Sequence, residues 1–288
     1  MARWFVSFAD ARLSRSLARI RVQAQAMGCF DHIAVHDQAA LDPGFRARFA
    51  HELVPSRRGF GYWVWKPQIL LQTLAAMSDG DVLLYLDAGC HLRPAGRARM
   101  DEYFAQVAAD PQGIVLFQNK PWRGGPAEAS WHLPDAHWTK GDLLDHLGVR
   151  DRPDILGTGT IAGGIILLRK GPEAIAFVRA WQSVYEHDLR LIDDSPSRSP
   201  DPPGFIEHRH DQSVCSILAK LRGVTTLSAF EHWYPSLARP GRPDWGPLHD
   251  RPIWAMRDKD IGWWLRLVTL PGRALRRARR MLGAAPWR

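Results

Sequence analysis

The stretch Val82-Leu83-Leu84-Tyr85-Leu86, followed directly by Asp87-Ala88-Gly89, is the part of the sequence that decides the fold. An unbroken apolar run after the turn signal Asp79-Gly80 predicts a strand that is buried on both faces, as in a parallel sheet covered by helices. In open parallel sheets, ligands bind in the crevice beyond the carboxyl ends of the strands. Asp87 therefore stands where a binding site is expected.

The segments around this strand repeat an alternation of strand and helix. Residues 4–8 and 32–36 are rich in strand formers, and they enclose a helical pattern that Gly28 ends. Pro67 to Met77 predicts another helix, because proline is preset for the first helical turn and apolar residues recur at helical spacing. Further strands are predicted over 113–117 and 161–168, and further helices over 172–187 and 212–221. The pattern predicts an α/β fold with a mixed, mostly parallel sheet flanked by helices.

Size and composition fit a folded enzyme or binding protein. The 288 residues suit one α/β domain with a tail, and 45% hydrophobic residues are enough for a sizeable core. The net charge of +8 suits a polyanionic partner, which could be nucleic acid, anionic lipid or a diphosphate substrate. Three widely spaced cysteines match neither a disulfide framework nor a metal site, and no signal-peptide core or membrane-length apolar run is present. We therefore expect a cytoplasmic protein.

The C-terminal residues 259–288 form a basic amphipathic tail after a domain that covers residues 1–258. Trp263 and Trp264 precede several leucines and a series of arginines. This pattern predicts either an interfacial helix on an anionic membrane or a docked C-terminal helix. The first alternative would make the protein peripheral on the inner face of the plasma membrane, close to a lipid-linked acceptor. A nucleic-acid partner is not expected, because the arginines concentrate in this tail and no nucleic-acid-binding motif is present.

The loop over residues 59–66 is rich in aromatic residues and ends on a lysine. Its rings, Tyr62, Trp63 and Trp65, could stack on a base or a sugar, or they could form a tryptophan-rich corner of the core. Lys66 stands at the start of a predicted helix, where N–H groups and the helix dipole attract anions, so we expect it to face phosphate. Asp87 is the best-placed carboxylate to hold a divalent cation on a departing diphosphate, although aspartate is also common in turns.

Three blocks stand in order along the chain, and they are Gly59-Phe60-Gly61-Tyr62-Trp63-Val64-Trp65-Lys66-Pro67, Tyr85-Leu86-Asp87-Ala88-Gly89-Cys90 and His208-Arg209-His210-Asp211-Gln212-Ser213. Together they resemble bacterial GT-A glycosyltransferases of the surface-polysaccharide type, which belong to the nucleotide-diphospho-sugar transferase superfamily. The resemblance covers residues 1–255. It implies a GT-A-like, Rossmann-like single domain that moves a sugar from a nucleotide-diphosphate donor to a glycan or lipid-linked acceptor in cell-surface polysaccharide synthesis.

The resemblance also implies the site residues. The donor pocket would contain Tyr62, Trp63, Trp65, Lys66, Asp87, Ala88 and Gly89, with Gly163 and Gly164 on a small-residue strand beside the bound sugar. The alternative for these two glycines is a bulge or tight packing. Asp87 takes the place of the first carboxylate of the family's Asp-x-Asp metal motif, and Gly89 stands where the second would be. Mn²⁺ or Mg²⁺ would then need the diphosphate, waters and another side chain, for which Asp211 and His249 are the candidates.

Asp211-Gln212 resembles the Asp-Gln pair that many retaining GT-A enzymes carry near the acceptor side of the anomeric carbon. We expect these two residues to be catalytic, since a carboxylate there could act as a base, a metal ligand or an orienter of the acceptor hydroxyl. The alternative is a purely structural role for Asp211 as the N-cap of the following helix.

Two other classes of protein remain for comparison. A non-catalytic binder of sugar nucleotides or glycans could keep the same fold, and the missing second carboxylate keeps that alternative open. A nucleotidyltransferase should open with a glycine-rich basic loop after the first strand, and Phe8-Ala9-Asp10-Ala11-Arg12 contains no glycine.

Overall fold

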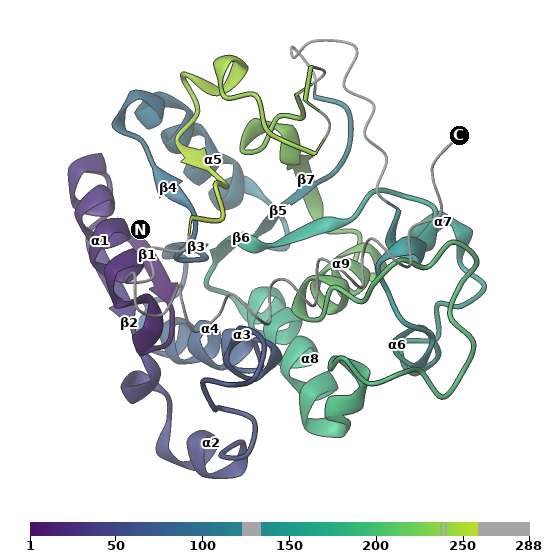
Figure 1. The fold of residues 1–288 in the computed structure, drawn as a ribbon. Coiled ribbons are helices and arrows are strands. Elements are labelled where there is room, and N and C mark those ends of the chain that lie inside the picture. Colours follow the sequence, from purple (N-terminus) through teal and green to yellow (C-terminus); the bar gives the residue numbers. More distant parts are fainter. Residues whose placement is uncertain (123–133, 237, 240, 259–288) are drawn as a thin grey trace.

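The computed structural model describes residues 1–122, 134–236, 238–239 and 241–258 (Figure 1). Its main element is a sheet of six strands in the order β2-β1-β3-β6-β5-β7. The strands are β1 (Arg3–Phe8), β2 (His32–His36), β3 (Val82–Leu86), β5 (Ile114–Gln118), β6 (Ile161–Arg169) and β7 (Thr225–Ser228). Only β6 runs antiparallel to its neighbours, β3 and β5. The predicted mixed, mostly parallel sheet flanked by helices is therefore confirmed.

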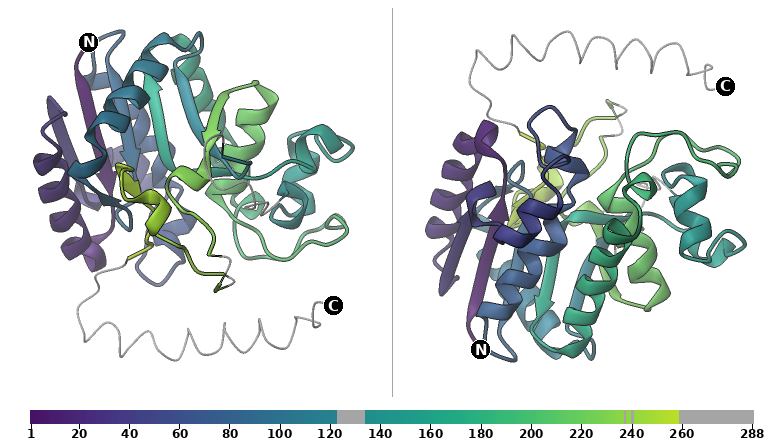
Figure 2. Two further views of the ribbon diagram at one scale, coloured as in Figure 1. Left: turned by 90° about the horizontal axis from the view of Figure 1, so that it is seen from above. Right: turned by 90° about the horizontal axis from the view of Figure 1, so that it is seen from below.

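The helices of the described chain are α1 (Ser14–Met27), α2 (Pro43–Arg48), α3 (Gly59–Tyr62), α4 (Trp65–Ala76), α5 (Arg97–Ala109), α6 (Gly141–His146), α7 (Pro153–Leu156), α8 (Pro172–His187) and α9 (Asp211–Leu221). Among them, α4, α8 and α9 cover one face of the sheet, and α1 and α5 cover the other (Figure 1). A second, two-stranded sheet joins β4 (His91–Leu92) to β8 (Ile253–Trp254) in antiparallel register. This small sheet brings the C-terminal end of the described chain back to the segment that follows β3 (Figure 2).

The alternation of side chains along β3 divides the core into two layers. Successive residues of a strand point to opposite faces. Leu83 and Tyr85 pack with α4, α8 and α9 on one face, whereas Leu84 and Leu86 pack with α1 and α5 on the other. All four of these side chains are fully buried, as the apolar run predicts for a central strand. Continuing the same alternation by one step aims Asp87 at the α4 and α9 side.

Two predicted helices begin earlier than their patterns indicated. The helix predicted from Pro67 starts at Trp65, which places Pro67 within the first turn, where proline is tolerated. The helix predicted from Gln212 starts at Asp211. The edge strand β7, which has only four residues, and helix α5 were not predicted from the sequence.

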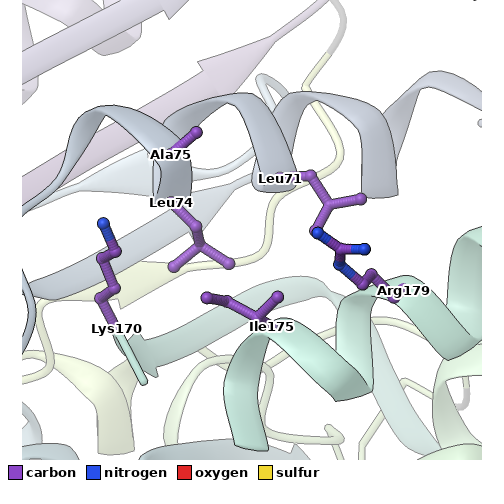
Figure 3. Close-up of a pocket in the computed structure, with 6 residues that line it drawn as sticks. All are labelled: Leu71, Leu74, Ala75, Lys170, Ile175 and Arg179. Carbon is purple, nitrogen blue, oxygen red and sulfur yellow. The ribbon is translucent and has the colours of Figure 1, made fainter. Parts of the chain in front are cut away.

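A groove of about 280 Å³ lies between α4 and α8 and is lined by Leu71, Leu74, Ala75, Lys170, Ile175 and Arg179 (Figure 3). Lys170 follows the end of β6, which is antiparallel to β3. The groove therefore opens at the edge of the sheet opposite Asp87. Within the residues that the structure describes, no helix is long and apolar enough to cross a bilayer. The predicted tail over 259–288 lies outside those residues.

Candidate active site

Asp87 extends β3 beyond its carboxyl end and is held by its neighbours in space. Its backbone N–H donates to the carbonyl of Gly164 at 2.9 Å, which continues the pairing of β3 with β6. The hydroxyl of Tyr85 donates to Oδ1 of Asp87 at 2.8 Å. The Asp87 side chain is still 39% exposed, so it is oriented by the protein and open to a ligand.

Lys66 lies in the first turn of α4 with its side chain only 1% exposed. Its Nζ donates to Oδ2 of Asp211 at 2.5 Å and to the carbonyl of Gly163 at 2.9 Å, and it lies 3.1 Å from Oδ1 of Asp87. Burial alone would lower the pKa of Lys66, but the carboxylates of Asp211 and Asp87 outweigh burial and raise it. Lys66 is therefore a buried, charged link between two carboxylates.

This position corrects the prediction that Lys66 faces phosphate. A lysine ammonium has about three N–H groups to donate, one for each of its hydrogens, and it cannot accept a hydrogen bond. The three oxygen partners from Asp211, Gly163 and Asp87 occupy all of those donors. The sequence placed Lys66 correctly at a helix start, but the helix turns the side chain toward the sheet and away from solvent.

Asp211 is the first residue of α9, and its side chain is 9% exposed. Burial raises the pKa of Asp211 to about 6, and the Lys66 ammonium opposes that rise. The residue that precedes the helix is His210, with φ 52°, and no side-chain capping bond is formed there. The N-cap interpretation of Asp211 is therefore not what the structure shows, because its carboxylate Oδ2 is bonded to Lys66.

Two glycines of β6, Gly163 and Gly164, pack directly against Gln212 and Asp87. A Cβ atom on Gly164 would lie 2.6 Å from Oδ2 of Asp87, and one on Gly163 would lie 3.1 Å from Cα of Gln212. The small-residue strand predicted from the sequence is thus required for close packing. The atoms that approach it are those of Asp87 and Gln212 themselves, so the glycines bring the candidate residues together.

The aromatic loop before α4 is a turn of left-handed helix. Five consecutive residues have positive φ, namely Gly59 (59°), Phe60 (54°), Gly61 (89°), Tyr62 (53°) and Trp63 (61°). Left-handed backbone costs about 1–2 kcal/mol for each residue that has a Cβ atom. Such strain persists only where surrounding contacts fix it, and it concentrates at functional sites.

Those contacts include the residue that precedes Asp211. The His210 ring lies 5.2 Å from the ring of Tyr62 and 5.7 Å from that of Trp63. His210 Nδ1 lies 2.6 Å from the carbonyl of Ile192, which only accepts, so Nδ1 carries the proton. Burial lowers the pKa of His210 to about 4, so the ring is neutral at physiological pH. The strained turn before Lys66 and the strained residue before Asp211 thus pack against each other.

Three predicted site residues do not line the site. Trp65 is 4% exposed, packs on Phe8 with ring centroids 4.1 Å apart, and donates from Nε1 to Gly59, so it belongs to the core as the alternative interpretation had it. Ala88 is 4% exposed, and its carbonyl accepts from Arg19 at 2.8 Å. His249 follows the short helix η7 (Gly246–Leu248) on the surface, and its Nδ1 lies 3.2 Å from the carbonyl of Gly246.

The chain's C-terminal described residues complete this edge, which the sequence did not reveal. Asp258 donates its backbone N–H to the carbonyl of Gly89 at 3.0 Å and pairs with Arg19 at 3.0 Å. A Cβ atom on Gly89 would lie 3.3 Å from Cα of Arg257. The position of the missing second carboxylate is therefore crowded by the backbone of Arg257. Arg257 itself is exposed with φ 53°, and no hydrogen bond or ion pair engages its guanidinium in the part of the chain described.

The described side chains provide few ligands for a divalent cation. Among them there is no group of three or more His, Cys, Asp and Glu side chains that could hold a metal ion. The contacts of Asp87 engage Oδ1 and leave Oδ2 facing Gly164, while Oδ2 of Asp211 is bonded to Lys66. Mg²⁺ is commonly bound through one or two carboxylates together with substrate phosphates and waters. These residues therefore fit a cation that a diphosphate brings, held by Asp87, and do not form a cage of their own.

No protein-family profile matches the chain, and no characterised protein matches it by sequence. Solved structures of glycosyltransferases share features of the fold. The galactosyltransferase LgtC, in complex with donor and acceptor sugar analogues, is 15% identical with a TM-score of 0.42, over 94% of this chain and 95% of that one. The glycosyltransferase GlyE of Streptococcus pneumoniae TIGR4 is 11% identical with a TM-score of 0.46, over 91% of this chain and 56% of that one.

A third structure is a glycosyltransferase involved in the glycosylation of the major capsid of PBCV-1, at 10% identity and a TM-score of 0.40, over 81% of this chain and 84% of that one. These are distant likenesses of fold, and they assign neither an activity nor a substrate to this chain.

Proposed function

We propose that the protein is a glycosyltransferase that moves a sugar from a nucleotide-diphosphate donor to a glycan or lipid-linked acceptor. The observation that carries the proposal is the assembly of Asp87, Lys66 and Asp211 at the carboxyl end of β3, above Gly163 and Gly164. Ligands bind at this edge of open α/β sheets. The resemblance of the three sequence blocks to surface-polysaccharide enzymes supports the reaction class and a role in cell-surface polysaccharide synthesis.

The reaction breaks the bond between the anomeric carbon and the diphosphate, so the site must stabilise charge on the leaving diphosphate. Arg257, which is exposed beside Gly89, supplies a fixed positive charge at this edge. Asp211 is ionised near neutral pH because its pKa, raised by burial to about 6, is still below 7. Its ionised carboxylate beside Gln212 could orient the acceptor hydroxyl or the donor sugar.

The proposal includes a divalent cation, Mn²⁺ or Mg²⁺, held by Asp87 together with the donor diphosphate. When bound there, the cation would offset charge on the leaving group. Asp87 has one carboxylate oxygen, Oδ2, outside the contacts with Tyr85 and Lys66, which both engage Oδ1. Removal of the metal by a chelator should therefore lower turnover without unfolding the protein.

The proposal also includes the C-terminal tail as a contact with anionic membrane. The chain reaches residue 258 beside Gly89, so the tail begins at the edge of the candidate site. Its tryptophans and arginines suit the membrane interface. A lipid-linked acceptor would then be presented close to Asp87 and Asp211. Co-sedimentation with anionic vesicles, compared between the full chain and a chain ending at residue 258, tests this part alone.

A panel of nucleotide sugars tests the proposed activity. Purified protein is incubated with each donor, with and without Mn²⁺ or Mg²⁺, and release of the nucleoside diphosphate is measured. We expect metal-stimulated release from one donor and its loss in Asp87→Asn, with Asp154→Asn on an exposed ion pair as the control. Binding of a nucleotide sugar with no turnover under any condition would favour the non-catalytic binder, for which the glycine at position 89 is the supporting feature.

A further inference from the structure

The candidate site contains a cation of its own, the ammonium of Lys66, which lies between Asp87 and Asp211. Lys66 Nζ lies 3.1 Å from Oδ1 of Asp87 and 2.5 Å from Oδ2 of Asp211, and it donates to the carbonyl of Gly163 at 2.9 Å. An ammonium surrounded by two carboxylates and a carbonyl occupies the kind of oxygen-lined position that a hard divalent cation also prefers. The side chain is 1% exposed, so solvent ions do not share this position.

The surroundings fix the ammonium in place. The left-handed turn that ends at Trp63 leads directly into the first turn of α4, where the backbone N–H of Lys66 donates to the carbonyl of Trp63 at 2.9 Å. The rings of Trp65 and Tyr85 lie 5.9 and 5.5 Å from Nζ, within the range of cation–π attraction. Moving the lysine out would leave the buried carboxylate of Asp211 and the partly exposed carboxylate of Asp87 facing each other without a counter-ion.

We propose that Lys66 is a positioning residue that takes the place of a metal ion between Asp87 and Asp211 and so keeps Asp211 out of any metal site. The ammonium contacts both carboxylates and holds them at a fixed separation. It also engages Oδ1 of Asp87, which leaves Oδ2 as the oxygen that can reach a ligand. Asp211 then acts only through its charge and its hydrogen bonds. The consequence for catalysis rests on the proposed function, whereas the exclusion of metal by Lys66 does not.

Removing the lysine charge should therefore create a metal site that the native protein lacks. In Lys66→Met, two carboxylates and the Gly163 carbonyl would face an unfilled position of cation size. We expect Mn²⁺ alone, without any nucleotide, to bind the full-length variant at least about tenfold more tightly than it binds the native chain, because affinity for such ions rises with the number of carboxylate ligands. The measurement is a titration of MnCl₂ in which free Mn²⁺ is counted by electron paramagnetic resonance.

Matched variants separate this effect from general loss of structure. Lys140 is also buried, at 2% exposure, but it pairs with a single carboxylate, Asp193, at 3.3 Å. Lys140→Met should gain no Mn²⁺ affinity. The double variant Lys66→Met with Asp211→Asn removes one of the two negative charges, so it should lose the gain that Lys66→Met shows. Equal Mn²⁺ affinity of Lys66→Met and the native chain, or a gain that survives in the double variant, would overturn the proposal.

A second measurement covers the case in which Lys66→Met does not fold. Asp211→Asn is nearly isosteric and keeps Lys66. If Asp211 is not a metal ligand, native protein and Asp211→Asn should bind Mn²⁺ with the same affinity, whereas a loss of about threefold or more would overturn the proposal. None of these titrations uses a nucleotide sugar, so their failure is distinct from failure of the proposed glycosyl transfer.

Discussion

Gly164→Ala is the substitution that tests the packing of the site most sharply. Its backbone is not in the left-handed region, so alanine adds only a methyl group, whose carbon would lie 2.6 Å from Oδ2 and 3.0 Å from Cγ of Asp87. An ordinary contact begins near 3.4 Å, so the carboxylate must move by about 0.8 Å. That movement carries Asp87 away from the oxygen positions that Lys66 and Tyr85 hold.

The energetic cost follows from the bonds that Asp87 would lose. A hydrogen bond to a charged group contributes about 1.5–3 kcal/mol, and water re-solvates part of this 39% exposed side chain, so a net cost of about 1–2 kcal/mol is expected. Misplacement of a reacting group by about 1 Å can lower turnover by about 10²-fold. Gly164→Ala should therefore lose most of its activity while it remains folded.

Two assays check this prediction. Urea unfolding followed by circular dichroism gives the free energy of unfolding, and release of nucleoside diphosphate gives turnover per folded molecule. Gly171→Ala is the control, since Gly171 has extended backbone with φ −177° and the nearest atom to its Cβ would be 4.0 Å away. Native-like stability and turnover in Gly164→Ala would show that Asp87 does not lie against β6 as described.

Three further predictions concern stability, each measured by equilibrium unfolding. Gly61→Ala should lower the free energy of unfolding by about 2–4 kcal/mol, because φ is +89° and the new Cβ would lie 2.8 Å from the carbonyl oxygen of Glu52. Gly80→Ala, at φ +84° with nothing within 4 Å, should lower it by only about 1–2 kcal/mol. Equal losses would mean that the left-handed turn is not tightly packed. Asp135→Asn should cost about 3–5 kcal/mol, since it breaks a buried pair with Lys220, and a loss below about 1 kcal/mol would contradict that account. Burial lowers the pKa of His232 from its ordinary 6.5 to about 3, so unfolding takes up a proton below pH 6.5. The free energy of unfolding should therefore fall by at most about 1.4 kcal/mol per pH unit between pH 6.5 and about pH 3. His232→Leu should flatten this slope, and an unchanged slope would show that the imidazole is not neutral in the fold.

The sequence predicted the sheet and the position of Asp87 at the end of β3 because those signals are local. The apolar run of β3 gave both its burial and the position of Asp87 at its carboxyl end. The resemblance singled out Gly163 and Gly164 as residues beside a bound sugar, and the structure places Asp87 and Gln212 against them. These inferences needed only the residues within one element.

The partners within the site could not be predicted, because they depend on packing between distant elements. Lys66 and Asp211 are 145 residues apart in the chain, and their contact exists because α4 and α9 lie on the same face of the sheet. The left-handed turn also places the start of α4 two residues before Pro67, and this phase decides that Trp65 enters the core while Lys66 reaches the carboxylates. Likewise, nothing near Gly89 signals that the backbone of Arg257 will fill the space beside it.

Turnover of Asp211→Asn per folded molecule tests most directly whether the cluster of Asp87, Lys66 and Asp211 is a reaction centre. Asparagine keeps the shape of the side chain and removes the charge that Lys66 pairs with. With the donor that the native protein uses, and with the folded fraction measured by circular dichroism in the same sample, the account predicts a loss of about 10²-fold or more in turnover. Native turnover per folded molecule, even with reduced stability, would show that Asp211 only stabilises the fold and would contradict the account.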